Sequence, residues 1–363
     1  MHGSPMTAHA LDTDAFVGEV DGVPVGLVTI TGGAGLSLSI CTYGARWLQA
    51  LVPDAEGVVR DVVLGYDSLQ GVRDGVPSMG AFIGRYACRI GGAAFPLSGR
   101  SWRLSANDGA NCLHGGAGGS RHQVFQVVDQ GTDFVTMAHR FRSAVDGFPG
   151  DLLLHVTYAI EGDNKVCIRY RAEALDRDTV GSFTSHAFFN LDGCSSGTVQ
   201  AHALQVNAPA WLPLDKDKLP TGSVLPVGDT PFDLRSSAAL DSHSVWDGSQ
   251  GQFGFDHAWV WPDPPAEITG LRLQATLVGA QSGIAMDVWS TSPCLVVYTG
   301  GALDGTLPKH AGKAGRAMGR YAGICLEPQA YPDAPNHPSF PSTLIPKGTV
   351  HSGEIQYHFR IAT

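Results

Sequence analysis

The chain has 363 residues, of which 43% are hydrophobic and 16% charged, so it can bury a large core and is neither a disordered protein nor a coiled coil. The net charge of −10, without a cluster of Lys and Arg, excludes a nucleic-acid groove and disfavours binding to an anionic membrane. Because the sequence contains no apolar run of the roughly 18 residues that a spanning helix needs, no transmembrane segment is predicted.

The start of the chain and the cysteines indicate the compartment. MHGSPMTAHA has no basic segment followed by an apolar one, so no export signal is predicted, and residues 1–10 are interpreted as a disordered or tag-derived start with Met6 as a candidate first residue. Seven cysteines form no CxxC pair and no regular framework, and their number is odd. We interpret them as reduced thiols in a cytoplasmic protein.

Short segments with alternating apolar or β-branched residues predict strands throughout the chain. Gly, Pro, Asn and Asp clusters such as NDGAN and EGDN separate them, as in hairpins. Two weak helices are expected, at residues 68–72 and 236–240. No linker or internal repeat divides the chain. We therefore predict a single domain over 1–363, an all-β, large antiparallel β-sandwich, with strands at 36–42, 58–64, 124–128, 134–139, 152–158, 166–171 and 295–298.

Common cofactor and hydrolase motifs are missing. The sequence contains no GxGxxG after a strand, no GxxxxGK[ST], no HExxH and no GxSxG. His and carboxylate residues do not occur at metal-ligand spacing. We predict that the protein uses no cofactor and no metal.

Four segments carry residues suited to acid–base chemistry or to binding hydroxyl groups. His114 precedes glycines in NCLHGG, either as a turn residue or where a ligand approaches closely. His186 lies in the apolar FTSHAFFNL, as a core residue or as a proton-exchanging group whose pKa burial lowers. Glu327 in GICLEPQ is either a strand-end residue or a base whose pKa burial raises. Asp256 in GFDHAW could accept hydrogen bonds from sugar hydroxyls or fix a turn, and nearby aromatics could stack on a sugar ring.

The order and spacing of these motifs resemble the aldose 1-epimerase (galactose mutarotase) family from about Leu36 to Phe359. The resemblance rests on the segments YGARWLQALVPDAEG, DVVLGYDSL, GAFIGRYACRI, NDGANCLHGG, GFPGDLLLHVTY, FTSHAFFNL, LPTGSVLPVGDTPFDLR, GFDHAWV and CLEPQAYPDAPNHPSFPS. It implies a galactose mutarotase-like β-supersandwich that interconverts the α and β anomers of a free sugar without a cofactor.

The resemblance also implies the roles of single residues. Glu327 takes the role of the base and His186 that of the acid. Arg89, His114 and Asp256 match substrate-binding positions, and Arg85 is a further candidate contact from the same segment as Arg89. The ring-opening reaction itself requires such a pair, because one group must remove the C1 hydroxyl proton while another protonates the ring oxygen.

Several positions depart from the family pattern. Cys88 stands where Asn is common, Ser185 where Asn is common, Phe188 where Tyr is common, and Gly301 where Asn is frequent. Two polar groups that could bind hydroxyls are thereby lost at Cys88 and Phe188. We expect these departures to alter the rim of the sugar pocket and to shift the sugar preference.

Other functions remain open from sequence alone. An epimerase for hexose 6-phosphates would require a basic cluster, for which only RYACR is a candidate. A non-catalytic sugar-binding sandwich would explain the aromatics but not the acid–base pair, and a glycosidase would normally carry two carboxylates. We expect a small-molecule sugar as the partner, no nucleic acid or membrane partner, and a monomer or homodimer.

Overall fold

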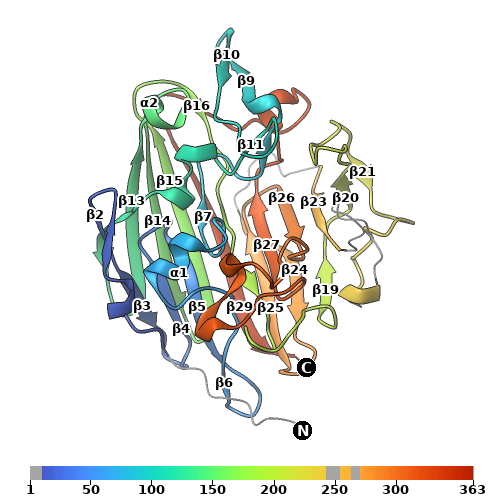
Figure 1. Cartoon of the computed structure of the whole chain (residues 1–363). Coiled ribbons are helices and arrows are strands. Elements are labelled where there is room, and N and C mark those ends of the chain that lie inside the picture. The colour runs from blue at the N-terminus through green and yellow to red at the C-terminus, as the bar shows by residue number, and fades with distance from the viewer. Residues whose placement is uncertain (1–9, 243–253, 263–269, 363) are drawn as a thin grey trace.

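A computed structural model describes residues 10–242, 254–262 and 270–362, and the predicted disordered or tag-derived start lies almost wholly outside them. Within these ranges the chain is built from antiparallel strands with two short α-helices (Figure 1). No helix in the described ranges is long and apolar enough to cross a membrane.

One layer of the molecule is a nine-stranded sheet with the spatial order β12-β13-β14-β15-β29-β25-β24-β19-β22. Its inner face is apolar because alternate residues of a strand point to the same side, as the buried Leu152, Leu154 and Val156 do on one strand. The strands are β12 (Gln126–Gln130), β13 (Phe134–Phe141), β14 (Leu152–Glu161), β15 (Lys165–Ala174), β29 (Val350–Ile361), β25 (Ile284–Ser290), β24 (Arg272–Val278), β19 (Ala203–Val206) and β22 (Ala238–Ala239).

The other layer contains a six-stranded sheet, which carries the candidate base, and a four-stranded sheet. The six-stranded sheet consists of β18 (Phe188–Phe189), β27 (Ile324–Gln329), β26 (Cys294–Tyr298), β23 (Asp256–Val260), β20 (Ala210–Leu212) and β21 (Leu225–Pro226), in this spatial order. The four-stranded sheet consists of β3 (Leu27–Thr31), β4 (Ser37–Cys41), β5 (Arg46–Pro53) and β6 (Val59–Asp61).

Small elements connect and cover the layers. Two-stranded sheets form from the pairs β1 (Gly18–Val20) and β2 (Val23–Val25), β9 (Ala94–Leu97) and β10 (Arg100–Arg103), β8 (Arg89–Ile90) and β11 (Cys112–Leu113), β16 (Thr179–Val180) and β28 (Leu344–Ile345), and β7 (Phe82–Ile83) and β17 (Thr184–Ser185). The helices are α1 (Leu69–Asp74) and α2 (Ser143–Asp146), with 3-10 turns at Asp14–Phe16, Gly91–Ala93, Gly116–Gly118, Ser120–His122, Leu240–Ser242, Pro308–His310, Lys313–Gly315 and Ala334–Asn336.

A continuous cluster of buried apolar side chains joins the layers and includes residues from Ile30 to Phe359. Trp47 on β5 shows how it does so, because its ring packs edge-to-face against Phe189 of the six-stranded sheet and Tyr357 of the nine-stranded sheet, with ring centroids 5.4 and 5.5 Å apart. Such packing helps to fix β18, and through it the neighbouring β27, against the nine-stranded sheet.

All seven predicted strands are confirmed, as β4, β6, β12, β13, β14, β15 and β26, with shifts of a few residues at their ends. The predicted helix at 68–72 is confirmed as α1, where the Ser68 side chain caps the helix by accepting a hydrogen bond from the Gly71 amide. The predicted helix at 236–240 is wrong. Ala238 and Ala239 instead pair with β19 as strand β22, so the sheet edge outweighs a weak helical propensity.

Candidate active site

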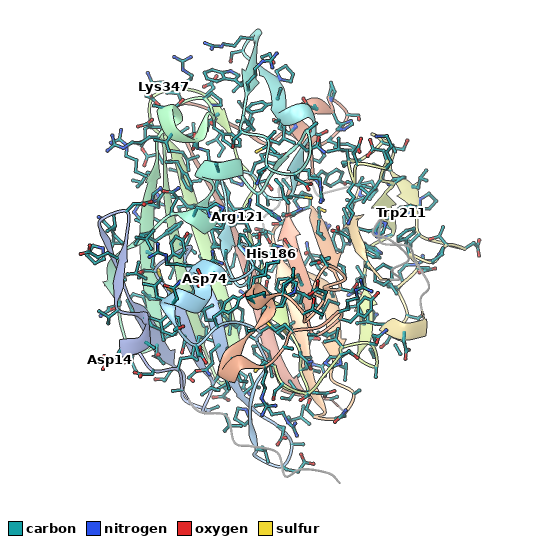
Figure 2. All side chains as sticks on the ribbon, viewed as in Figure 1. Asp14, Asp74, Arg121, His186, Trp211 and Lys347 are labelled. Atoms are coloured by element: carbon teal, nitrogen blue, oxygen red, sulfur yellow. The ribbon has the colours of Figure 1, made fainter. Side chains whose placement is uncertain are left out.

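A cavity of about 270 Å³ brings together seven of the eight residues singled out from the sequence. It lies over one face of the six-stranded sheet, and His186 is near the centre of the molecule in Figure 2. The seven predicted residues that line it are Cys88, Arg89, His114, His186, Phe188, Asp256 and Glu327, and the other lining residues are Val76, Ser78, Leu113, Lys218, Val296, Tyr298, Ala302, Leu303, Lys309 and His310.

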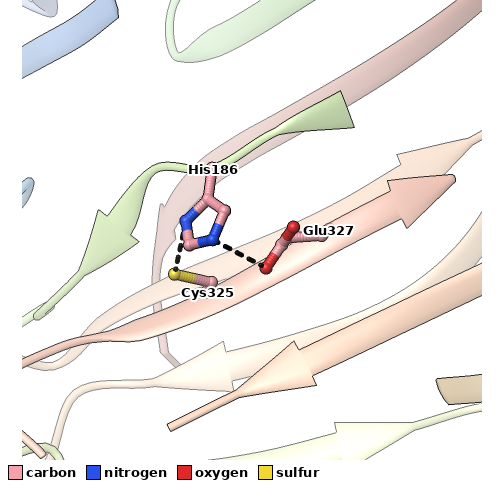
Figure 3. Close-up of side chains that lie close together, drawn as sticks. All are labelled: His186, Cys325 and Glu327. Atoms are coloured by element: carbon pink, nitrogen blue, oxygen red, sulfur yellow. Dashed lines mark hydrogen bonds and ion pairs between the residues drawn. The ribbon is translucent and has the colours of Figure 1, made fainter. Parts of the chain in front are cut away.

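Glu327 is placed by β27, a strand buried along its whole length. Ile324 and Leu326 belong to the core between the layers, so the alternation of the strand turns Cys325 and Glu327 toward the opposite side, where the cavity lies (Figure 3). Glu327 is 3% exposed. Burial, together with the charge of Asp256, raises its pKa well above the usual range for a glutamate, as predicted.

His186 lies between β17 and β18, on the segment that faces β27. Its backbone is fixed by two hydrogen bonds, from its own amide to the carbonyl of Ala81 and from the amide of Gly80 to its carbonyl, at 2.9 and 3.0 Å. The ring is buried, and this burial lowers its pKa to about 4, as the apolar surroundings predicted. The imidazole is therefore neutral near pH 7 in the free protein.

The two side chains approach each other without a hydrogen bond. His186 Nε2 lies 3.7 Å from Glu327 Oε1, and His186 Nδ1 lies 3.4 Å from Cys325 Sγ (Figure 3). Opposite pKa shifts mean that the proton shared by the pair resides on the carboxyl group while the imidazole stays neutral. A carboxyl group and an imidazole thus stand side by side in one cavity, an arrangement suited to general acid–base chemistry.

Potential metal ligands come together here although their spacing in the sequence did not indicate it. One ligand atom each from His186, Cys325 and Glu327 lies within 4.8 Å of the others. The sequence-based prediction of no metal considered only ligands close together along the chain. This cluster is instead assembled from β27, which carries Cys325 and Glu327, and from the segment between β17 and β18, which carries His186. Burial raises the pKa of the Cys325 thiol well above its ordinary value, so a metal would have to displace its proton.

His114 follows β11 and is held as a hydrogen-bond donor to the cavity. The amide of Cys88 donates to His114 Nδ1 at 3.2 Å, which leaves the proton of the neutral ring on Nε2. Burial, with contributions from His186, Arg121 and Arg89, lowers its pKa well below 6.5, so the ring stays neutral. The following Gly115 has a φ of +80°, and a Cβ there would lie 2.7 Å from the carbonyl oxygen of Gly84. The glycine allows close packing of this loop against a neighbouring backbone.

Arg89 and Asp256 supply charged groups at the cavity wall. Arg89 donates from Nε to Asp108 at 2.7 Å. Burial opposes its charge, but Cys88, Asp256 and Asp108 outweigh burial and keep the pKa of Arg89 above its ordinary value. Burial alone would raise the pKa of Asp256, yet Lys218 and Arg89 together hold it below 3.8. Asp256 is therefore a carboxylate that can accept hydrogen bonds from hydroxyl groups.

Arg85 is the one predicted contact that the structure places elsewhere. Its side chain is fully buried, and its Nε lies 2.8 Å from Asp146 Oδ2. Its remaining nitrogens donate to Thr179 Oγ1 and to the carbonyls of Pro149 and Gly150. Arg85 and Arg89 would share a face of a continuous strand, but β7 ends at Ile83 and the chain bends before β8. The prediction that Arg85 contacts the sugar is therefore not supported.

Five polar cavity residues were missed by the sequence analysis: Ser78, Lys218, Tyr298, Lys309 and His310. Tyr298 could have been found from the sequence, since it ends a predicted strand. In the structure it pairs with Asp256 on one side and Cys325 on the other. Lys218 lies in LDKDKLP, which is typical of a solvated turn. His310 gives no local signal, and its Nδ1 is 2.7 Å from Asp304 Oδ1 in the same loop.

The departures from the family pattern fall at different depths. Cys88 and Phe188 line the cavity, and burial raises the pKa of the Cys88 thiol to about 11, so it stays protonated. Ser185 is fully buried on β17 and does not line it. A second cavity of about 610 Å³, between β15, β29 and the loops at 181–183, 291–293 and 341–343, contains none of the residues predicted for the site.

Fold and site together define a class of protein: an antiparallel β-sandwich whose cavity holds a carboxyl group and an imidazole suited to acid–base chemistry. The chain matches the family model described as aldose 1-epimerase over residues 26–358. This match and the relatives below show that the chain belongs to the aldose 1-epimerase family.

Two curated relatives illustrate the similarity. Galactose mutarotase of Bos taurus is 34% identical over 332 residues, covering 90% of this chain and 92% of the relative. Aldose 1-epimerase of Escherichia coli (strain K12) is 33% identical over 342 residues, covering 93% of this chain and 96% of the relative.

Solved structures agree on the architecture. An aldose epimerase homologue from C. elegans has a TM-score of 0.85 at 28% identity and covers 93% of this chain and all of its own. Galactose 1-epimerase from Lactobacillus acidophilus NCFM has a TM-score of 0.81 at 21% identity, with 98% of this chain covered and all of its own, which supports the fold. The predicted galactose mutarotase-like β-sandwich is confirmed.

Proposed function

We propose that the protein is an aldose 1-epimerase, an isomerase that interconverts the α and β anomers of a free aldose, with Glu327 as the base and His186 as the acid. The observation that carries the assignment of roles is the approach of these two groups to 3.7 Å in one cavity. Membership of the family and the names of the relatives support the reaction.

Ring opening requires two proton transfers. The single proton of the pair first moves from Glu327 to His186. Glu327 then removes the proton of the C1 hydroxyl, the bond between C1 and the ring oxygen breaks, and His186 protonates the released oxygen. The product is an open-chain aldehyde, whose C1–C2 bond can rotate. Closure runs the steps in reverse, with His186 taking back its proton and Glu327 returning one to the new C1 hydroxyl. The protein ends as it began.

The pKa shifts of Glu327 and His186 favour the protonation state of the open-chain stage of the reaction. At the open-chain stage Glu327 is protonated and His186 is neutral, which is the arrangement that burial favours in the free cavity. At the closed-ring stages the pair is a carboxylate and an imidazolium, the charged forms that burial disfavours. Burial thus favours, in the free cavity, the same protonation state that the mechanism requires at the open-chain stage.

The remaining cavity groups suit a polyhydroxylated ligand. Asp256 is an acceptor, Arg89 is a donor, and the tautomer of His114 presents a donor proton on Nε2. Cys88 and Phe188 contribute a weak thiol and an apolar ring to the same cavity. We infer a sugar preference that differs from relatives carrying an amide and a phenol at these places.

Polarimetry tests the proposal directly. Freshly dissolved α-D-glucose, α-D-galactose, α-D-xylose and L-arabinose are followed with and without protein, and spontaneous mutarotation is subtracted. We expect faster relaxation to an unchanged final rotation with at least one sugar. A folded sample that accelerates none of them would contradict the proposal.

We also propose a cytoplasmic location and a monomer or homodimer. All seven cysteines are free thiols, and five of them are buried, which supports a reducing compartment. Fractionation of the source cells and light scattering of the purified protein would test both points.

A further inference from the structure

Lys218 reaches the cavity from a tight turn between β20 and β21. Asp215 closes this turn, since its Oδ1 accepts hydrogen bonds from the amides of Asp217 and Leu219 at 2.9 and 3.0 Å. The amide of Lys218 donates to the Asp215 carbonyl at 3.1 Å, and Lys218 has a φ of +60°. A left-handed backbone is unfavourable for a lysine, so the hydrogen bonds of the turn hold it there.

The side chain of Lys218 is joined to the candidate hydroxyl acceptor. Its Nζ donates to Asp256 Oδ2 at 2.8 Å, and its side chain is 24% exposed. This bond uses one of the three ammonium protons and one of the two carboxylate oxygens. Among the described residues no other side chain or backbone group donates to Asp256, so Oδ1 keeps its capacity to accept, and Lys218 keeps two donors.

The location of the pair relates it to the catalytic groups. Asp256 pairs with Tyr298 on β26, and that strand pairs with β27, so the ion pair lies on the cavity wall with one strand between it and the strand of Glu327. Asp256 is close enough to contribute to the raised pKa of Glu327. A sugar ring that places C1 at Glu327 and His186 therefore presents other hydroxyls to Lys218 and Asp256.

We propose that Lys218 and Asp256 together bind two neighbouring hydroxyl groups of the sugar, with Asp256 accepting from one and Lys218 donating to the oxygen of the other. The inference rests on the proposed function and names a specificity-determining residue for it. A donor and an acceptor in contact match adjacent ring hydroxyls, each of which can donate to one partner and accept from another. An epimer that turns one of the two hydroxyls away loses one of these bonds.

The test compares Lys218→Met with the matched variant Lys216→Met. Lys216 lies in the same turn, but its side chain is 86% exposed, pairs with Asp217 and does not line the cavity. Initial rates of mutarotation are measured by polarimetry with D-glucose and with its 2-deoxy, 3-deoxy and 4-deoxy analogues. Circular dichroism verifies that each variant is folded.

For Lys218→Met we expect KM for D-glucose to rise about tenfold or more with kcat changed only a few-fold, because a charge-assisted hydrogen bond to bound substrate is lost. With the deoxy analogue that lacks the hydroxyl bound by Lys218, the variant and the wild type should have the same KM. Lys218→Arg should retain part of the affinity, and Lys216→Met should match the wild type with every sugar.

If Lys218→Met raises KM by the same factor with D-glucose and with all three deoxy analogues, the proposal is overturned. That result would show that Lys218 acts only through the shape or charge of the cavity. An unchanged KM with all of them would overturn it as well. Both results leave the proposed function standing, because the wild type still accelerates mutarotation. Failure of the wild type itself would refute the proposed function.

Discussion

Two of the buried acid–base pairs among the described residues behave in opposite ways. Arg85 and Asp146 lie 2.8 Å apart, and the guanidinium also donates to a hydroxyl and two carbonyls. Glu327 and His186 lie 3.7 Å apart without a hydrogen bond between them, next to an open cavity. The first pair is enclosed by fixed protein partners, and the second faces a cavity that a ligand can enter.

The pKa values show that burial is costly in both places. Burial raises the pKa of Asp146 to about 6 despite the neighbouring Arg85, and it also lowers the pKa of Arg85. Even a well-surrounded ion pair is thus not a free gain in stability. For Glu327 and His186 the same penalty favours neutral forms that exchange one proton. A buried charge serves the fold when its partners are fixed, and serves chemistry when a partner position is left open.

The largest expected effect comes from removing the open pair. Glu327→Gln and His186→Gln should each lower kcat by about 10²–10⁴-fold, because a positioned acid or base contributes about that factor. Polarimetry measures the rates. Glu161→Gln is the matched control, since Glu161 pairs with Lys165 and Arg169 away from the cavity and its loss should leave kcat unchanged. Near-normal turnover in folded Glu327→Gln would contradict the assignment.

The filled pair should instead affect the fold. Arg85→Met leaves the buried Asp146 without its partner and should lower the free energy of unfolding by about 3–5 kcal/mol, with kcat unchanged at temperatures where the variant is folded. Urea unfolding measures the difference. Arg85→Met combined with Asp146→Asn should recover much of the loss, because the amide can still accept from the Phe148 amide. Equal destabilisation of the single and double variants would show that the pairing is not the cause.

The pH dependence of kcat/KM should report the single proton of the open pair. Below about pH 4 His186 is protonated while Glu327 keeps its proton, so the pair carries two protons. No group is then free to act as the base, and the rate falls as pH decreases. As pH rises through the raised pKa of Glu327, the pair loses its only proton and the rate falls again. Polarimetry over this range, with circular dichroism at each pH, measures the profile. An acid limb near 6.5, the ordinary value for histidine, would contradict the burial argument.

The smallest expected effect lies at the cavity rim. Cys88→Asn restores a carboxamide that can bind a hydroxyl, so the ratio of kcat/KM between galactose and glucose should change by a few-fold to about tenfold. Cys194→Asn, at a half-buried thiol that does not line the cavity, should leave the ratio unchanged. An unchanged ratio in Cys88→Asn would remove Cys88 from the determinants of specificity.

The strands were predictable because their signal is local. In β14 and β15 the alternation of buried and half-buried residues follows directly from the pleat, so the sequence shows it. The helix expected at 236–240 failed because a neighbouring strand edge, which no local pattern shows, captured two alanines. The single-domain organisation stays a prediction, supported by the continuous core.

The site was only partly predictable. Motif order identified Glu327 and His186, but their approach depends on the packing of β27 against a segment far away in the chain. Arg85 and Arg89 look equivalent in GRYACR, and only the break between β7 and β8 separates their directions. Lys218 gave no signal at all, because its left-handed turn and its bond to Asp256 exist only in three dimensions.

The cavity draws its groups from positions 89, 114, 186, 256 and 327, which lie on elements far apart in the chain and meet only in the folded sandwich. Catalysis should therefore be an all-or-none reporter of folding: loss of turnover during denaturation should coincide with loss of β-sheet signal. Neither half of the chain could retain a fraction of the activity. A split or permuted version of this enzyme should therefore show no rate until all of these elements are assembled again.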